Sequence, residues 1–162
     1  MRTLATESIQ KVGQDITLMG WVQSRRDHGG LIFIDLRDHT GLVQLVINPD
    51  TAEAFRLAEE LRDEFVIAAT GTVAEREETL RNPNLETGNI ELKVTEIRIL
   101  NRAETLPIQP FAEAQANEEL RLKYRYLDLR RPKMQHMLAR RAEYYTYMRR
   151  YVEAAGFTEV AT

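Results

Sequence analysis

One phenylalanine in the first third of the chain lies among charged residues. Residues 21–38 read WVQSRRDHGGLIFIDLRD, and three apolar residues there alternate at the period of two typical of a buried strand face: Ile32, Ile34 and Leu36. Phe33 falls on the opposite face, with Asp35 and Arg37. If the strand were rotated to bury Phe33, Ile32 and Ile34 would be exposed to solvent. An aromatic ring on a solvated strand can stack on an unpaired nucleic-acid base, which contributes about 1–3 kcal/mol.

Polar side chains on the neighbouring predicted strands face the same side as Phe33. Gln44 alternates with Val43, Leu45 and Ile47, and Glu91 and Lys93 alternate with Ile90, Leu92 and Val94. Two basic residues end another strand beside this surface, Arg25 and Arg26. Amide and carboxylate groups can pair with the edges of splayed bases, and guanidinium groups also neutralise phosphate. The alternative is that Phe33 packs in a core and the polar residues are merely solvated, so this pattern alone leaves nucleic-acid binding open.

These side chains need a small β-sheet domain to position them. The alternation predicts strands at residues 15–26, 31–38, 42–48, 65–75 and 90–100, with a short amphipathic helix within residues 49–64. A tight Gly29–Gly30 corner is expected to join the first two strands, and Gly41 is expected to supply a positive φ in the next hairpin turn. Asp50 and Glu53 form a capping-box pattern. Three strands, a helix and two strands are typical of an all-β OB-fold, a five-stranded Greek-key barrel. Another small barrel or an α+β sandwich is the alternative.

The remainder of the chain has a different pattern. Residues 101–132 contain prolines and dense charge and are expected to form a connector, and apolar spacing predicts a long helix from Lys133 to Ala155 that ends at Gly156. The residues FTEV at 157–160 are expected to begin a strand. This helix and strand have no partner within the sequence, so we expect the start of a second domain. The expected division is 1–103, a hinge at 104–132, and 133–162.

Composition narrows the class of protein. Of 162 residues, 43% are hydrophobic and 29% are charged, which is typical of a globular chain, and no apolar run is long enough to span a membrane. The chain has no cysteine, and its three histidines do not have metal-ligand spacing. A cytoplasmic location is therefore expected. Residues 1–117 contain 12 basic and 19 acidic residues, a net charge of −7, so any nucleic-acid site there must be a local patch.

Several segments resemble the bacterial-type aspartyl-tRNA synthetases. These are RRDHGGLIFIDLRDHTGLVQLV, LKYRYLDLRRPKM and NPNLETGNIEL, the last departing from the family pattern at Glu86 and Asn89. The RYLDLR segment is shared with the lysyl and asparaginyl relatives. GFTEVAT resembles the start of class II motif 1, with Ala161 in place of an acidic residue. The resemblance covers essentially the whole chain.

The resemblance implies an OB domain that binds a tRNA anticodon, a hinge, and the truncated start of a class II α+β catalytic domain. It assigns four anticodon readers: Phe33 stacks on the middle uracil, Gln44 pairs with a uracil edge, Glu91 accepts hydrogen bonds from guanine, and Arg26 donates to cytosine. His28 is typical of relatives that charge asparagine tRNA as well as aspartate tRNA. The resemblance therefore implies tRNA as partner, with relaxed specificity as one reading.

The parent enzyme implied by the resemblance is an ATP-dependent aspartate–tRNA ligase that uses Mg²⁺ and forms a homodimer. No residue of this chain is assigned a catalytic, cofactor-binding or metal-binding role, because the corresponding motifs 2 and 3 are not in the sequence; the chain alone is expected to be inactive. Three basic residues are candidates for contact with the tRNA backbone: Arg25, Arg121 and Lys123. The alternatives are a stand-alone single-stranded nucleic-acid-binding OB module, a barrel used only for assembly, or the equivalent part of an asparaginyl- or lysyl-tRNA synthetase.

Overall fold

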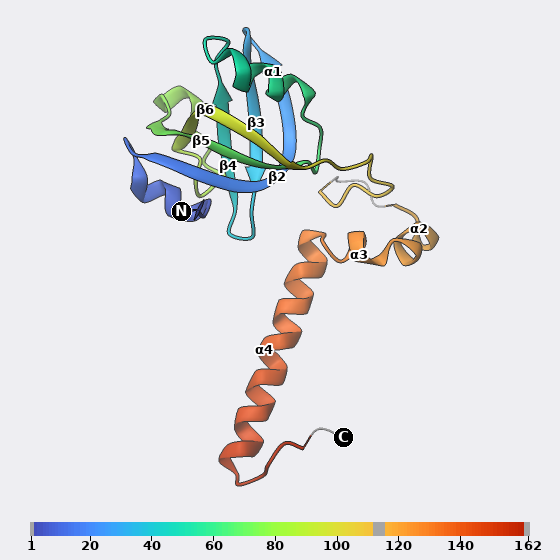
Figure 1. Ribbon diagram of the computed structural model, residues 1–162. Helices are drawn as coiled ribbons and strands as arrows, with labels where there is room; N and C mark the ends of the chain where they lie inside the picture. Colours follow the sequence, from blue (N-terminus) through green and yellow to red (C-terminus); the bar gives the residue numbers. More distant parts are fainter. Residues whose placement is uncertain (1, 112–115, 161–162) are drawn as a thin grey trace. The chain divides into compact units, whose positions relative to one another are not determined.

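The computed structural model describes residues 2–111 and 116–160, which form two compact units (Figure 1). One unit extends to Thr105 and the other begins at Leu106. The division into three parts expected from the sequence is finer than this and stays a prediction. Within the described residues, none of the helices combines the length and hydropathy that a membrane span requires.

The first unit is a closed barrel with the strand order of an OB fold, as predicted. Its sheet runs β1-β2-β3-β4-β6-β5, and β5 also pairs with β2, which closes the barrel. The β4–β6 pairing is parallel and closes the Greek key. The strands are β1 (Arg2–Thr3), β2 (Asp15–His28), β3 (Leu31–Arg37), β4 (Leu42–Ile47), β5 (Val66–Glu75) and β6 (Ile90–Asn101).

The predicted alternation places the core correctly. The inward residues of the three central strands are all buried: Ile32, Ile34 and Leu36 on β3, Val43, Leu45 and Ile47 on β4, and Ile90, Leu92 and Val94 on β6. Between them, the residues of β3 and β4 that face outward are partly exposed. The barrel therefore packs its interior from one face of each strand and leaves the other face for contacts with solvent or ligand.

Two short segments near the N-terminus were not predicted. β1 pairs in parallel with β2, and a 3-10 helix, η1 (Thr6–Lys11), follows it. A second 3-10 helix, η2 (Glu78–Leu80), lies in the loop between β5 and β6. A two-residue strand and single 3-10 turns have no apolar periodicity by which a sequence could reveal them.

One glycine expectation is confirmed and the other is wrong. Gly29 and Gly30 join β2 to β3 with φ angles of 61° and 81°, as a tight two-residue hairpin requires. Gly41, in the β3–β4 turn, does not have a positive φ. That turn is instead held by the carboxylate of Asp38, which accepts hydrogen bonds from the backbone N–H groups of Thr40 at 2.7 Å and Gly41 at 3.2 Å. A side-chain acceptor of this kind replaces the need for a left-handed glycine.

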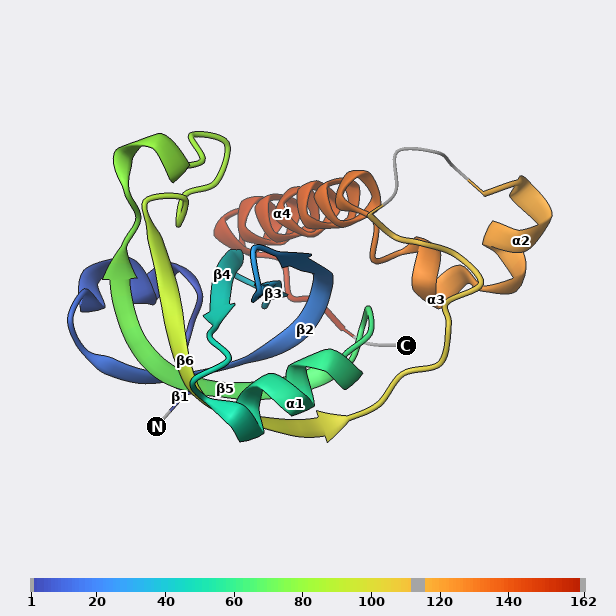
Figure 2. The same cartoon turned by 90° about the horizontal axis from the view of Figure 1, so that it is seen from above.

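The helix between β4 and β5, α1 (Ala52–Glu60), covers one end of the barrel (Figures 1 and 2). Ala54 and Ala58 are its buried residues. The predicted capping box at Asp50 is wrong, because the helix begins after Thr51 without a side-chain cap. Asn48 organises the approach instead: its Oδ1 atom accepts from the backbone N–H of Asp50 at 3.0 Å.

The second unit is helical. Two short helices, α2 (Glu118–Lys123) and α3 (Arg125–Asp128), occur within the predicted connector, and α4 (Pro132–Ala154) is the predicted long helix. Gly156 follows it with a φ of 88°, as expected for a glycine that ends a helix. The predicted strand at residues 157–160 is wrong, because these residues form no strand in the structure. Ala161 lies outside the described residues.

Candidate nucleic-acid interface

Two adjacent cross-strand rows make up the outer face of the barrel around Phe33. In the first row, Phe33 on β3 lies opposite Arg26 on β2 and Val46 on β4. In the second, Asp35 lies opposite Ser24 and Gln44. Directly opposite residues share one face of a sheet. The aromatic ring, partly exposed, therefore lies between Arg26 and Val46, with the polar second row beside it.

A bulge in β2 determines which arginine joins this face. The pairing with β3 shifts by one residue between Val22 and Ser24. Because side chains alternate, the shift brings Arg26 to the outer face and turns Arg25 to the other side. Arg25 then donates from Nε to the carbonyl oxygen of Ala58 at 2.8 Å, at the last turn of α1. The structure thus separates two neighbouring arginines that the sequence analysis placed together.

Asp35 holds Arg26 in position. Nη2 of Arg26 lies 3.0 and 3.1 Å from the two carboxylate oxygens of Asp35, and the hydroxyl of Ser24 donates to Oδ2 at 2.6 Å. The Arg26 side chain is still 57% exposed. Its guanidinium group is thus oriented by the pair and keeps donors that an incoming base or phosphate can reach.

Glu91 extends the polar row onto β6. The parallel register pairs Leu45 with Leu92, so the residues preceding them, Gln44 and Glu91, are neighbours on the outer face. Burial raises the pKa of the Glu91 carboxyl, while the positive charges of Arg76 and Lys93 oppose this rise. The amide and the carboxylate together offer both donor and acceptor atoms to a base edge.

Arg76, which the sequence analysis missed, lies just beyond β5 beneath this polar row. It is only 7% exposed, and its Nε atom donates to the carbonyl oxygen of Ile90 at 2.9 Å. Burial lowers the pKa of its guanidinium group, and the negative charges of Glu91 and Asp35 counteract that effect. An arginine that opens a polar loop gives no sequence signal for such a position. Its charge offsets the two carboxylates of the face.

The loop between β5 and β6 is folded on itself beside the site. The backbone N–H of Asn82 donates to the carbonyl of Gly88 at 3.1 Å, and a Cβ atom at Gly88 would lie 1.9 Å from the Asn82 carbonyl oxygen. The hydroxyl of Thr87, a buried residue, donates to the carbonyl of Leu42 at the start of β4. The loop is therefore anchored next to the strand that carries Gln44.

His28 lies at the edge of the same face. It is the last residue of β2, opposite Leu31, and it is exposed. The Gly29–Gly30 hairpin follows it directly. Four of the predicted contact residues thus lie together on one face: Arg26, Phe33, Gln44 and Glu91. His28 lies at the edge of this face.

Of the two residues of the second unit predicted to contact the tRNA backbone, Arg121 binds a buried carboxylate, whereas Lys123 lies near an aromatic ring. Asp128 is fully buried and accepts hydrogen bonds from Nε of Arg121 at 2.9 Å, Nη1 of Arg125 at 2.8 Å and Nη1 of Arg131 at 3.2 Å. The hydrogen bond from Arg121 lowers the pKa of the Asp128 carboxyl against the effect of burial. Lys123 lies 5.4 Å from the ring centroid of Tyr124. Arg121 is thus engaged within its own unit.

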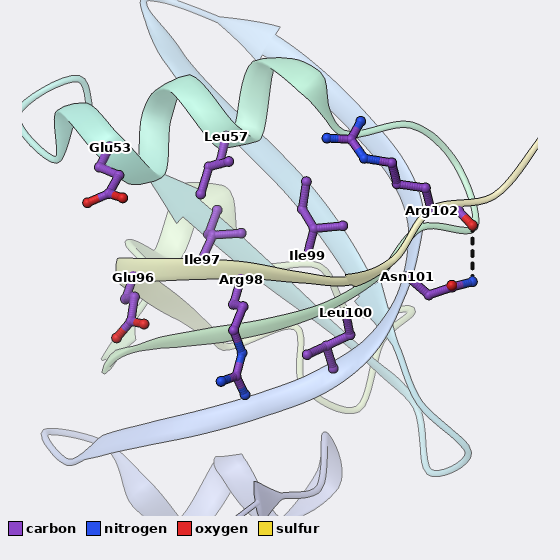
Figure 3. A pocket seen from close by; sticks show the side chains of 9 residues that line it. All are labelled: Glu53, Leu57, Glu96, Ile97, Arg98, Ile99, Leu100, Asn101 and Arg102. Carbon is purple, nitrogen blue, oxygen red and sulfur yellow. Dashed lines mark hydrogen bonds between the residues drawn. The ribbon is translucent and has the colours of Figure 1, made fainter.

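A separate groove of about 740 Å³ lies between α1 and the C-terminal part of β6 (Figure 3). Leu57 of α1 and Ile97 and Ile99 of β6 line its apolar part. Arg98, also on its lining, points to the other side of β6 in this view. The described residues contain no group of three or more histidine, aspartate or glutamate side chains that could hold a metal ion.

Comparisons with known families agree with this geometry. Residues 16–100 match the OB-fold nucleic acid binding domain family, and residues 117–162 match the class II tRNA synthetases of the D, K and N group. The chain therefore belongs to the family of OB-fold nucleic acid binding domains. It continues into the start of a class II tRNA synthetase domain.

Its relatives are aspartate–tRNA ligases. The chain is 51% identical over 156 residues to the aspartate–tRNA(Asp/Asn) ligase of Halothermothrix orenii. The aligned residues cover 96% of this chain and 26% of the relative. It is 49% identical over 160 residues to the aspartate–tRNA ligase of Macrococcus caseolyticus, covering 98% of this chain and 27% of that protein. The chain thus spans about a quarter of the length of these relatives.

Solved structures of related synthetases share the fold. The asparaginyl-tRNA synthetase of Pyrococcus horikoshii bound to asparaginyl-adenylate superposes with a TM-score of 0.82 at 26% identity, over 99% of this chain and 36% of that one. A putative aspartyl-tRNA synthetase of Leishmania major superposes with a TM-score of 0.86 at 21% identity, over 100% of this chain and 34% of that one. At 21% identity, the similarity to the Leishmania structure shows a shared fold and nothing further.

Proposed function

We propose that the outer face of the barrel binds the anticodon of a tRNA, and that the chain is the N-terminal part of an aspartate–tRNA ligase. The observation that carries the proposal is the partly exposed ring of Phe33 on a face that also presents Arg26, Gln44 and Glu91. Such a face combines stacking with hydrogen-bonding groups, as recognition of single-stranded bases requires. The identity to aspartate–tRNA ligases over nearly the whole chain supports the same function.

Each side chain has a role that follows from its donors and acceptors. Phe33 stacks on the middle base, a uracil, and Gln44 pairs its amide with a uracil edge. The Glu91 carboxylate accepts from N1–H and the exocyclic amine of guanine, a donor pair that no other base offers at that edge. Arg26, held by Asp35, donates to the acceptors of cytosine. Arg25 has no part in this assignment, because it is directed to α1.

His28 supports a relaxed specificity for aspartate and asparagine tRNAs. The two anticodons differ at the third base, which Arg26 reads in this proposal. His28 is exposed two residues along β2 from Arg26, so its ring can reach the same nucleotide. The Halothermothrix relative, which carries the name aspartate–tRNA(Asp/Asn) ligase, gives independent support.

The remaining properties of the parent protein belong to the same proposal. The full-length ligase activates aspartate with ATP and Mg²⁺, forms a homodimer and acts in the cytoplasm. This chain by itself does not aminoacylate tRNA, since the residues for that chemistry belong to the larger part of its relatives that it does not span. Arg121 and Lys123 contact the tRNA backbone.

Binding of anticodon stem-loops to this chain tests the proposal. We expect the aspartate stem-loop to bind more tightly than loops in which the guanine or the uracil is replaced, and a third-base change to asparagine to be tolerated. Phe33→Ala should weaken binding about 5- to 100-fold through lost stacking. Leu100→Ala, which removes an exposed apolar side chain elsewhere on β6, is the matched control and should have no effect.

Two results would contradict the proposal. Equal affinity for all loops, with Phe33→Ala still weakening them, would indicate a general single-stranded nucleic-acid binder of the OB type. Unchanged affinity of the folded Phe33→Ala variant would indicate that the barrel face does not bind RNA and serves assembly instead. Thermal unfolding of each variant shows whether the barrel remains intact.

A further inference from the structure

The cross-strand row that contains Phe33 continues to a lysine on β6. Val46, which lies opposite Phe33 on β4, pairs on its other side with Lys93. The full row across the outer face is therefore Arg26, Phe33, Val46 and Lys93. At about 4.8 Å per strand, Lys93 lies two strands, or about 10 Å, from Phe33. The row thus has a cation at each end and the aromatic ring between them.

The two cations differ in what already binds them. Arg26 is paired with Asp35. Most of the other arginines of the barrel are also paired with carboxylates. Lys93 is exposed, and no ion pair or hydrogen bond within the described residues engages its ammonium group. A lysine ammonium is a compact charge on a long flexible stem, which suits contact with a phosphate more than base-edge reading.

The overall charge of the first unit makes such a cation significant. Residues 1–105 contain 12 basic and 18 acidic side chains, so the average field repels nucleic acid. Most of the affinity for a polyanion comes from contacts with phosphates. An acidic barrel that binds RNA therefore needs cations placed at the binding face, and Lys93 is the cation on the Phe33 row that is not already paired with a carboxylate in the described residues.

We propose that Lys93 binds the phosphate next to the nucleotide whose base stacks on Phe33. This inference rests on the proposed function, because it requires the base to lie on that ring. With the base flat against Phe33 and Val46, the backbone of the loop passes over β6, where the ammonium group meets it. Val46 supplies an apolar floor between ring and lysine. The contact holds the strand without reading its sequence.

The same β6 strand provides a matched control. Arg98 is also exposed, and likewise no ion pair or hydrogen bond within the described residues engages it. It lies five residues further along, about 16 Å at the rise of a strand, beside the groove of Figure 3 and away from the Phe33 row. Removing either charge changes the net charge equally, so only a local contact can make their effects differ.

The test measures binding of the aspartate stem-loop and of base-swapped loops over a salt titration. Lys93→Met should weaken all loops by the same factor, about 3- to 10-fold at low salt, and should reduce the slope of log K against log salt by about 0.7, the value for one contact with a single strand. Lys93→Arg should restore most of the affinity. Arg98→Met should leave both affinity and slope as in the original chain.

Two outcomes would overturn the inference. The first is an unchanged salt slope in Lys93→Met. The second is a loss restricted to loops with guanine, which would mean that Lys93 acts only through the neighbouring Glu91. Phe33→Ala, measured in parallel, separates the two proposals: if it weakens binding and Lys93→Met does not, only the phosphate contact fails. If neither variant matters, the anticodon-binding function fails as well.

Discussion

The two units of this chain bury their apolar residues to very different extents. In the barrel, each of the central strands β3 and β4 has three fully or nearly fully buried residues. In α4, all of whose residues are described, none is buried, and several large apolar side chains are exposed: Met137, Leu138, Tyr144, Tyr147, Met148 and Tyr151. Barrel closure pairs every strand, whereas an isolated helix depends on packing of one face for most of its stability. The barrel therefore buries a core of its own, whereas α4 buries none of its residues within the described part of the second unit.

Truncation of one leucine in each unit gives the largest predicted contrast. Leu45→Ala on β4 removes a side chain with 0% exposure and should lower the free energy of unfolding by about 2–5 kcal/mol. Leu138→Ala on α4, where the side chain is 38% exposed, should change it by no more than about 0.5 kcal/mol. Urea unfolding followed by circular dichroism measures both. A comparable loss in the two variants would show that α4 is packed in solution, and would break the comparison.

A buried charge organises the short helices of the second unit. Asp128 is fully buried among Arg121, Arg125 and Arg131. Asp128→Asn keeps the shape but leaves the guanidinium groups facing each other with no negative charge. Hydrogen exchange of the amides of residues 118–131 should accelerate strongly, while exchange in the barrel stays unchanged. Glu118→Gln, which neutralises an exposed carboxylate of the same unit, is the control, and equal acceleration in both variants would contradict the prediction.

Local patterns predicted the parts of the fold that depend on alternation and on single turns. The two faces of β3, β4 and β6 and the Gly29–Gly30 hairpin follow from side-chain period and from glycine. The errors at Gly41 and at residues 157–160 have different causes, one a local side-chain hydrogen bond and the other the need of a strand for a partner. Gly41 needs no positive φ because Asp38 holds its turn, and residues 157–160 form no strand because a strand requires a partner.

The candidate site shows the same limit. Phe33, Gln44 and Glu91 could be placed on one face from alternation alone. Arg25 and Arg26 could not be separated, because a bulge in β2 reverses which of them faces outward. Arg76 was missed because its position beneath the face depends on the closure of β5 on β6 and on a hydrogen bond to Ile90. Bulges and buried polar contacts of this kind have no period in the sequence.

Asp38, one of the buried carboxylates of the barrel, gives its stability a predictable dependence on pH. Burial raises the pKa of Asp38, but hydrogen bonds from Thr40, Ala5 and Gly41 outweigh this, so its pKa is below the ordinary value of 3.8. A lowered pKa in the folded state adds stability above pH 3.8, and this stability is lost as pH falls through the folded value. Asp38→Asn should therefore cost about 1–3 kcal/mol at neutral pH and less in acid. Unfolding by urea at several pH values measures this, and a constant difference at all pH values would contradict it.

The smallest predicted effect concerns the RNA affinity of the polar face of the barrel rather than the stability of its core. Burial raises the pKa of Glu91, so this carboxyl takes up a proton at higher pH than an ordinary glutamate. The protonated form no longer offers two acceptors to guanine. Affinity for the aspartate stem-loop should then fall as pH is lowered through the pKa of Glu91, which lies above the ordinary 4.5, with no loss of fold. Glu91→Gln should weaken binding about tenfold at neutral pH and remove this pH dependence.

Loops with adenine in place of the guanine are the control, since they lack the donor pair that the carboxylate accepts. An unaltered pH profile in Glu91→Gln would assign the titration to another group and would leave guanine recognition without its acceptor.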